Sequence, residues 1–294
     1  MTSSAFFITI FYMTTIESIV IGIVEGLTEF LPISSTAHMV ITESILGSTS
    51  KNDKFVEVFT IAIQLGAILS IVLLYWKKFF AFKNFRFYVK LFIAVIPALI
   101  LGKLFSEKID VILEKPLVIA GIMILGGVVF LFVDNFFKDH QTEKEENISL
   151  GTAFKIGLFQ CLSIFFPGLS RSASTIIGGM SLKLSRSLAA EFSFFLAVPT
   201  MAAATFYSIF LKNWHRNELG QVLEPKITGY QLITQSQENI TAFIVGNVVA
   251  FVVALVVVKF FIGFLQKHGF KIWGYYRIIV GTIIASLVLS GIIH

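Results

Sequence analysis

The chain alternates between long apolar runs and short polar connections. A helix needs about 20 apolar residues to cross the hydrocarbon core of a membrane. Six runs reach that length, and we expect spans at about 57–76, 88–106, 116–137, 187–211, 240–262 and 273–293. The pattern predicts an all-α integral membrane protein that forms one polytopic domain over residues 1–294.

Two further apolar segments are each interrupted near the middle by proline and small polar residues. The interruptions cover residues 32–36, here named the first polar turn, and residues 167–172, the second polar turn. Each half-segment has about 15 residues, or roughly 22 Å of helix, which is too short for an easy span. Irregular backbone survives at membrane depth only where protein or a water-filled cavity satisfies it. We therefore expect two re-entrant helix hairpins.

The two interrupted segments resemble each other. Glycine, acid or amide, proline and serine positions recur at an offset of 135, so that Gly22, Glu25, Pro32 and Ser35 match Gly157, Gln160, Pro167 and Ser170. Three spans separate the hairpins, so the second copy enters from the opposite side of the membrane. This predicts an inverted-topology repeat of residues 13–137 and 149–293, whose polar turns meet near the midplane. Residues 1–12 are interpreted as an N-terminal extension.

Composition and charge agree with a membrane protein. Hydrophobic residues make up 56% of the 294 positions and charged residues only 14%, whereas a soluble domain carries about a quarter charged residues. The net charge of +5 lies in short connections, which indicates membrane topology and not a nucleic-acid surface. Two segments carry bases without acids and are expected on the cytoplasmic side: 77–90, with Lys77, Lys78, Lys83, Arg86 and Lys90, and 259–277, with Lys259, Lys267, Lys271 and Arg277. The polar segment 212–239 is expected as an outer loop.

Two carboxylates precede the first polar turn. Glu25 and Glu29 are four residues apart, so they share one face of a helix. An unpaired carboxylate inside a membrane costs at least about 2.5 kcal/mol. Two interpretations stay open: a structural pair with Arg171 or a helix end, or a site for Mg²⁺ or Ca²⁺ that substrate phosphates complete.

Hydroxyl groups and a histidine follow in the same turn. Ser34, Ser35 and Thr36 come directly after the proline, where one of them caps the next half-helix. Capping explains one hydroxyl and not three. His38 lies one turn further on, either as a packing residue or as an acid, base or nucleophile.

The second polar turn has the features of an anion site. Ser170, Arg171 and Ser172 stand at the start of a half-helix, where free N–H groups and the helix dipole favour anions. The arginine adds a planar fork that suits phosphate oxygens. Gln64 is an intramembrane amide that either bridges helices or contacts the substrate. Acids at one turn and an anion clamp at the other would suit a diphosphate bridged by a divalent cation.

The longest motif resembles a known family. Residues 25–38, Glu-Gly-Leu-Thr-Glu-Phe-Leu-Pro-Ile-Ser-Ser-Thr-Ala-His, are similar to the first signature of the undecaprenyl-diphosphate phosphatase (bacitracin-resistance) family. Residues 167–172 resemble its second signature, and residues 63–67 and 191–199 also fit the family. The resemblance covers the chain from Met13. Ala37 and Ala173 depart from it, because both stand where the family usually has glycine.

The resemblance implies a multi-pass enzyme of the bacterial plasma membrane, with its site open to the outside. It would hydrolyse undecaprenyl diphosphate to undecaprenyl phosphate and inorganic phosphate, recycle the lipid carrier of peptidoglycan synthesis and confer resistance to bacitracin. A divalent cation, Mg²⁺ or Ca²⁺, would assist. The expected partners are the lipid substrate and the bilayer, with a homodimer as an open alternative. The functional positions of the family would fall on Glu25, Glu29, Ser34, Ser35, Thr36, His38, Ser170 and Arg171. Together with the analysis of the two turns, this predicts catalytic roles for Glu29, Ser35, His38 and Arg171 and cation binding by Glu25 and Glu29. Substrate binding is predicted for Ser34, Thr36, Ser170, Ser172 and Gln64.

Alternatives stay open at this stage. Ser35 or His38 could attack the terminal phosphorus with the other moving a proton, or water could attack directly. An inverted repeat with a polar site at the midplane is also the plan of a transporter or lipid flippase. The two classes differ in a simple way, because an enzyme releases phosphate in detergent and a transporter needs two compartments. A purely structural scaffold does not need so many buried polar groups.

Overall fold

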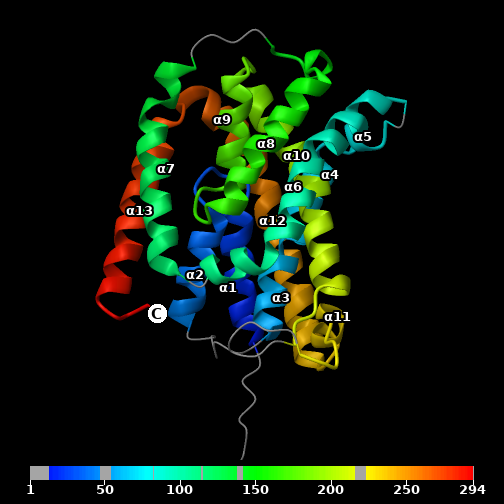
Figure 1. Ribbon diagram of the computed structural model, residues 1–294, viewed down its shortest axis with the longest axis vertical. Coiled ribbons are helices and arrows are strands. Elements are labelled where there is room, and N and C mark those ends of the chain that lie inside the picture. Colours follow the sequence, from blue (N-terminus) through cyan, green and yellow to red (C-terminus); the bar gives the residue numbers. More distant parts are fainter. Residues whose placement is uncertain are drawn as a thin grey trace, which may run out of the picture.

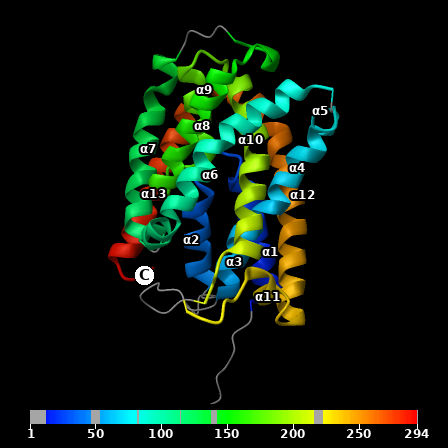
Figure 2. The same cartoon turned by 45° about the vertical axis from the view of Figure 1, so that its right-hand side comes forward.

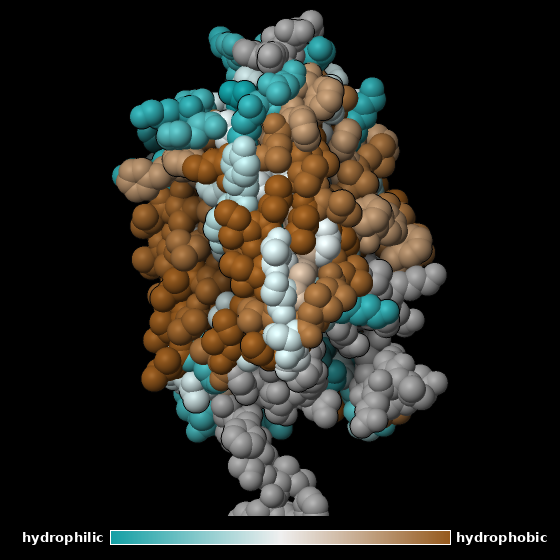
Figure 3. Space-filling model, turned by 90° about the vertical axis from the view of Figure 1, so that its left-hand side faces the viewer, coloured by the Kyte–Doolittle hydropathy of each residue, from teal (hydrophilic) through white to brown (hydrophobic). Residues whose placement is uncertain are grey.

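The computed structural model describes residues 13–46, 54–81, 83–113, 115–137, 142–215 and 223–293. These residues are mostly helical and contain no β-strand. Six helical segments are long and apolar enough to cross a membrane: Lys54–Leu74, Phe85–Phe105, Pro116–Phe136, Arg186–Leu211, Gln237–His268 and Lys271–Leu289. All six expected spans are thus confirmed as apolar helices, with boundaries shifted by a few residues. Figure 3 shows a broad hydrophobic band on one face, with hydrophilic side chains gathered above it.

The described residues form a series of helices. In chain order they are α1 Thr15–Thr28, α2 Ser35–Leu46, α3 Lys54–Ala62, α4 Gln64–Leu74, α5 Trp76–Phe79, α6 Phe85–Leu113, α7 Pro116–Phe136, η1 Glu145–Asn147, α8 Leu150–Phe165, α9 Arg171–Ser181, α10 Arg186–Phe206, the π-helix η2 Tyr207–Leu211, α11 Gly229–Ile233, α12 Gln237–His268 and α13 Lys271–Leu289.

Two short helix pairs occupy the middle of the bundle. Figures 1 and 2 show α1 and α2 in the lower half of the molecule and α8 and α9 in the upper half, so that their connecting turns face each other. α1 begins at a capping box in which Thr14 and Glu17 satisfy each other's backbone N–H groups. α8 begins at Ser149, whose hydroxyl accepts from the N–H of Thr152.

Small residues let each pair lie against a long helix. Gly22 of α1 contacts the backbone of α12 at Gly246, and Gly157 of α8 contacts the backbone of α6 at Ala94. A Cβ on either glycine would overlap the facing carbonyl oxygen. Close backbone approach of this kind is how helices associate in lipid, where apolar surface alone gives no preference for protein over the bilayer.

The structure corrects the sequence analysis at two basic segments. Lys90 is not in a solvated loop, because it lies inside α6, is 1% exposed and pairs with Glu145 at 2.8 Å. The segment 259–277 is not a loop either, since α12 continues to His268 and α13 begins at Lys271. Arg277 is therefore a residue of α13, and it is fully buried.

The expected outer loop at 212–239 is also partly folded. Trp214 is buried and donates its indole N–H to the carbonyl of Ser208, and α11 lies within the same segment. A large aromatic ring removes enough apolar surface from water to order the chain around it.

Candidate active site

The two polar turns meet in the structure. The hydroxyl of Ser172 donates to the carbonyl of Leu31 at 2.9 Å, and the guanidinium of Arg171 pairs with Glu29 at 2.9 Å. These contacts join residues that lie about 140 positions apart in the chain, at separations of 141 and 142. The expected contact between the two interrupted segments is confirmed, while its place near the midplane stays a prediction.

Each turn contains a serine with the same unusual conformation. Ser34 and Ser170 have φ angles of 72° and 76°. Each hydroxyl accepts from an N–H three residues later, that of Ala37 or Ala173, at 3.3 Å. Each serine thus satisfies one of the N–H groups that an α-helix leaves free at its start. Ser34 is the cap of α2, and the hydroxyl of Ser35 is left available for other partners.

The two caps correct the alignment of the turns by one residue. Ser34 and Ser170 are 136 positions apart, whereas the sequence pattern matched Ser35 with Ser170 at an offset of 135. The second turn has one more residue between its proline and its cap, and it uses Gly168 at φ 98° to reverse direction. In space, Ser35 therefore corresponds to Arg171, since each is the first residue of its helix.

A chain of hydrogen bonds connects the first residue of α2, the end of α1 and the first residue of α9. Ser35 donates to Oε2 of Glu29 at 2.7 Å, and Nη2 of Arg171 donates to Oε1 of the same carboxylate at 2.9 Å. Nη1 of Arg171 donates to the backbone carbonyl of Ser193 at 3.0 Å. The side chains of Glu29 and Arg171 are only 5% and 12% exposed, so little solvent screens this pair. The ion pair with Arg171, which the sequence left open as one interpretation, is therefore present for Glu29.

Glu25 is different from Glu29. It is 1% exposed, and among the described residues its Oε1 has no hydrogen-bond partner. A buried carboxylate oxygen without a partner is costly, and it fits the hard oxygen ligand that Mg²⁺ and Ca²⁺ prefer. Within the described part of the chain no three His, Cys, Asp or Glu side chains form a metal-binding group. Cation binding by Glu25 and Glu29 stays a prediction, and it would need further ligands from the substrate or from water.

His38 faces away from this chain of hydrogen bonds. Its Nδ1 lies 2.7 Å from the carbonyl of Ser34, and its Nε2 lies 2.8 Å from the hydroxyl of Tyr276 on α13. Because a carbonyl can only accept, Nδ1 carries a proton and neutral Nε2 accepts from Tyr276. The two rings stack with centroids 5.7 Å apart. In this arrangement His38 orients the start of α2 and makes no hydrogen bond to Ser35.

Three other predicted binding residues take different positions. Ser172 is fully buried, and its hydroxyl is hydrogen-bonded to the carbonyl of Leu31 and to the hydroxyl of Ser170. These contacts favour a role in joining the two turns. Thr36 is half-buried on the first turn of α2, next to Ser35. Gln64 begins α4, where the first span is interrupted at Ile63. Substrate contacts of Thr36 and Gln64 stay predictions.

Arg277 was not predicted to belong to the site. Its Nη1 donates to the carbonyls of Pro32 and Leu169 at 3.2 and 3.1 Å, and its Nη2 donates to Gly168 at 2.9 Å. One side chain of α13 thus holds both polar turns. A signal was present, because the expected loop 259–277 and the expected span 273–293 overlapped at this arginine. A charged residue inside a span is expected to be functional.

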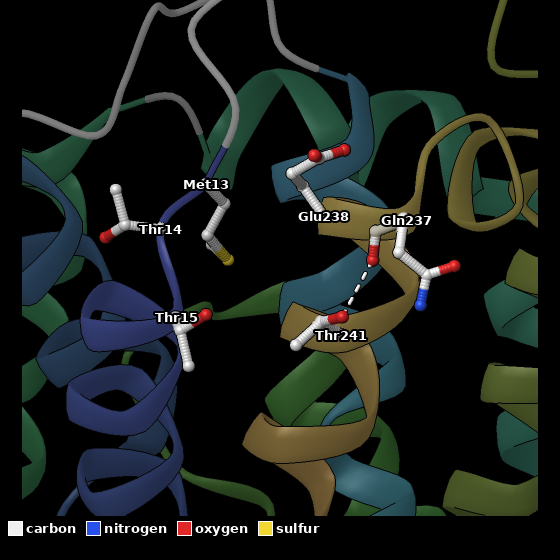
Figure 4. A pocket seen from close by; sticks show the side chains of 6 residues that line it. All are labelled: Met13, Thr14, Thr15, Gln237, Glu238 and Thr241. Atoms are coloured by element: carbon white, nitrogen blue, oxygen red, sulfur yellow. Dashed lines mark hydrogen bonds between the residues drawn. The ribbon is translucent and has the colours of Figure 1, made fainter.

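A pocket lies elsewhere in the molecule. It has a volume of about 290 Å³ and opens between the start of α1 and the start of α12 (Figure 4). None of the predicted site residues is among those that line it, which are Met13, Thr14, Thr15, Gln237, Glu238 and Thr241. The pocket is therefore separate from the predicted site residues.

Comparison with known proteins supplies the family. Residues 18–283 match the family described as bacitracin resistance protein BacA. The chain belongs to this family. Relatives named undecaprenyl-diphosphatase include those of Porphyromonas gingivalis, 48% identical over 95% of this chain and 99% of the relative, and Flavobacterium psychrophilum, 48% identical over 96% and 98%. The relative of the same name in Bdellovibrio bacteriovorus is 42% identical over 95% and 98%.

Both polar turns and the arginine of α13 lie inside the range that matches the BacA family. Residues 1–12, interpreted from sequence as an extension, lie outside the described residues. The candidate site therefore lies where the ends of α1 and α8 meet the starts of α2 and α9 beside α13, so it draws on both halves of the chain.

Proposed function

We propose that this protein hydrolyses undecaprenyl diphosphate to undecaprenyl phosphate and inorganic phosphate. It thereby recycles the lipid carrier of peptidoglycan synthesis and confers resistance to bacitracin. The observation that carries the proposal is the hydrogen-bonded chain of Ser35, Glu29 and Arg171 at two facing helix starts. Relatives up to 48% identical over nearly the whole chain have the name undecaprenyl-diphosphatase, and their name agrees with a site built for a diphosphate.

The two helix pairs are proposed to be re-entrant hairpins of an inverted repeat, with residues 13–137 and 149–293 as its halves. Their opposed positions in Figure 1 and their equivalent serine caps support this interpretation. Buried polar turns of this kind, enclosed by spans, are tolerated at membrane depth because protein satisfies them. The protein would lie in the bacterial plasma membrane, as a monomer or homodimer, with the site open to the outer face.

The substrate diphosphate would bind between the two helix starts. The N–H groups of Ser35 and Thr36 on one helix, and of Arg171 and Ser172 on the other, have no acceptor within their own helices. Together with the Arg171 guanidinium they present donors and positive charge from two directions. The prenyl tail would lie among the apolar side chains that face lipid, so that its affinity comes from burial.

Ser35 is the nucleophile that the geometry favours. Its hydroxyl already donates to Glu29, which would take the proton as Oγ attacks the terminal phosphorus. The Oγ–P bond forms, the bond from that phosphorus to the bridging oxygen breaks, and undecaprenyl phosphate leaves. Water then cleaves the phosphoserine and releases inorganic phosphate. Arg171 would stabilise the charge on the phosphoryl oxygens during transfer.

A divalent cation, Mg²⁺ or Ca²⁺, would neutralise charge on the diphosphate when bound. Glu25, with its unpartnered Oε1, and Glu29 would hold it. In the absence of a cation, the pairing of Glu29 with Arg171 offsets the charge of that carboxylate.

The decisive experiment is phosphate release from undecaprenyl diphosphate by the purified protein in detergent. We expect release that depends on Mg²⁺ or Ca²⁺ and stops when EDTA removes the cation. A well-folded protein that releases no phosphate under any of these conditions would contradict the enzyme. A transport assay in proteoliposomes would then test the flippase alternative, which needs two compartments.

Replacing Glu25 by glutamine tests the cation site. We expect the concentration of Mg²⁺ needed for half-maximal phosphate release to rise about tenfold or more, because one of two carboxylate ligands loses its charge. Glu43→Gln is the matched control, since Glu43 is a carboxylate of α2 that accepts from Thr60. An unchanged Mg²⁺ requirement in Glu25→Gln would assign the cation to other ligands.

A further inference from the structure

Arg277 has surroundings that differ from those of every residue discussed for the reaction. It is fully buried, and its guanidinium donates to four backbone carbonyls. Three of these carbonyls belong to the polar turns, and the fourth is that of Met123 on α7, at 3.3 Å. The ring of Phe130 lies 5.4 Å from the guanidinium carbon. All of its described partners are therefore carbonyls or an aromatic face, and none is a carboxylate.

Burying the charge of Arg277 in this way costs free energy, which a side chain that only fills space would not require. Burying a cation without an anion costs several kcal/mol unless good hydrogen bonds compensate, and an apolar residue of similar size would avoid that cost. The planar fork of arginine can reach several acceptors in a fixed geometry, which neither lysine nor an amide can reproduce. Here those acceptors are the carbonyls of Pro32, Gly168 and Leu169, which come immediately before the two catalytic helix starts.

The neighbouring helix leaves room for this side chain. A Cβ added to Gly126 of α7 would lie 2.5 Å from Nη2 of Arg277 and 3.1 Å from its Cζ. The same methyl group on Gly121, one and a half turns earlier on α7, would meet no atom within 4 Å. The glycine at position 126 thus provides the space that the guanidinium occupies.

We propose that Arg277 is a positioning residue for phosphate release: it locks the two polar turns together, so that Ser35 and Arg171 face the diphosphate at a fixed separation. The inference rests on the proposed function, and it concerns a residue that does not touch the substrate. The bonds of Arg277 to residues 32, 168 and 169 set the distance between the starts of α2 and α9. A misplacement of about 1 Å at a reacting group can cost 10²-fold in rate.

Gly126→Ala and Gly121→Ala form a matched pair that tests whether Arg277 holds the two polar turns together. Both substitutions add one methyl group to α7, and only the first displaces Arg277. The displaced atom is the end of a flexible side chain, so the fold can accommodate it while the bond from Nη2 to Gly168 is lost. We expect Gly126→Ala to lower kcat at least tenfold with KM changed less than threefold, and Gly121→Ala to leave both unchanged.

Two further measurements separate positioning from folding and from the proposed function itself. Hydrogen exchange of the amides of residues 34–38 and 170–174 should be faster in Gly126→Ala than in Gly121→Ala, whether or not the protein hydrolyses the lipid. Arg277→Lys, which keeps the charge and loses the fork, should behave as Gly126→Ala in both assays. Wild-type protein is assayed first, so that an inactive wild type contradicts the proposed function while the exchange data still test the lock.

The inference is overturned if Gly126→Ala and Gly121→Ala have the same exchange rates and the same kcat per folded molecule. It is also overturned if Gly126→Ala loses activity only in proportion to lost folded protein. In either case Arg277 contributes to stability alone.

Discussion

Replacing Arg171 by alanine is expected to lower phosphate release by about 10²–10³-fold, which is the usual loss when one donor to a developing anion is removed. The guanidinium donates to Glu29 and to the carbonyl of Ser193, and in the proposed mechanism it also binds phosphate oxygens. Arg171→Lys keeps the charge, but a single ammonium cannot make both contacts and bind phosphate oxygens. We therefore expect the lysine variant to lose at least tenfold.

The control for Arg171 is another arginine with an ion pair. Arg186 pairs with Asp134 at 2.6 Å at the start of α10, away from the polar turns. Arg186→Ala should retain phosphate release near the wild-type rate. If Arg171→Ala also keeps more than a tenth of wild-type turnover, the anion clamp must be sought elsewhere.

Replacing Ser35 by alanine is expected to lower turnover by at least about 10³-fold, because loss of a nucleophile removes the whole covalent route. The hydroxyl donates to Glu29 at 2.7 Å and is not used to cap α2, since Ser34 does that. Ser44→Ala is the matched control: its hydroxyl lies on the same helix and donates to the carbonyl of Val40. Phosphate release in detergent measures both.

His38→Ala belongs in the same experiment. Its ring is bonded to Ser34 and Tyr276 and not to Ser35, so we expect a smaller loss, of about tenfold, through the position of α2. Collapse in His38→Ala with turnover kept in Ser35→Ala would make His38 the nucleophile. Near wild-type turnover in both variants would contradict covalent catalysis and leave direct attack by water.

Some roles in the site followed from local sequence and others did not. Glu25 and Glu29 share a helix face by spacing alone, and Arg171 stands at a helix start because proline and glycine precede it. Both features depend on neighbours within a few residues. The sequence did not predict that Ser34 caps α2 while Ser35 donates to Glu29. These roles depend on a φ of 72° at Ser34 and on one additional residue in the other turn.

The positions of two basic side chains were also not predictable from the local sequence. Lys90 and Arg277 lie within a few residues of other bases in the sequence, and charge counting placed both in cytoplasmic loops. In the structure Lys90 pairs with Glu145, and Arg277 binds the carbonyls of both turns. The partners of Arg277 lie 108 to 245 residues away in the chain, so no local pattern describes them.

By itself the sequence determined the apolar spans, the two interruptions and the acids, hydroxyls and arginine that they carry, because these depend on hydrophobic run length and on short-range helix spacing. Only the tertiary structure decided which of these groups meet. It paired Glu29 with Arg171, left Oε1 of Glu25 without a partner among the described residues, and brought Arg277 between the turns. The physical reason is that a buried polar group must find its partner in three dimensions, and the chain can supply that partner from any helix that packs beside it.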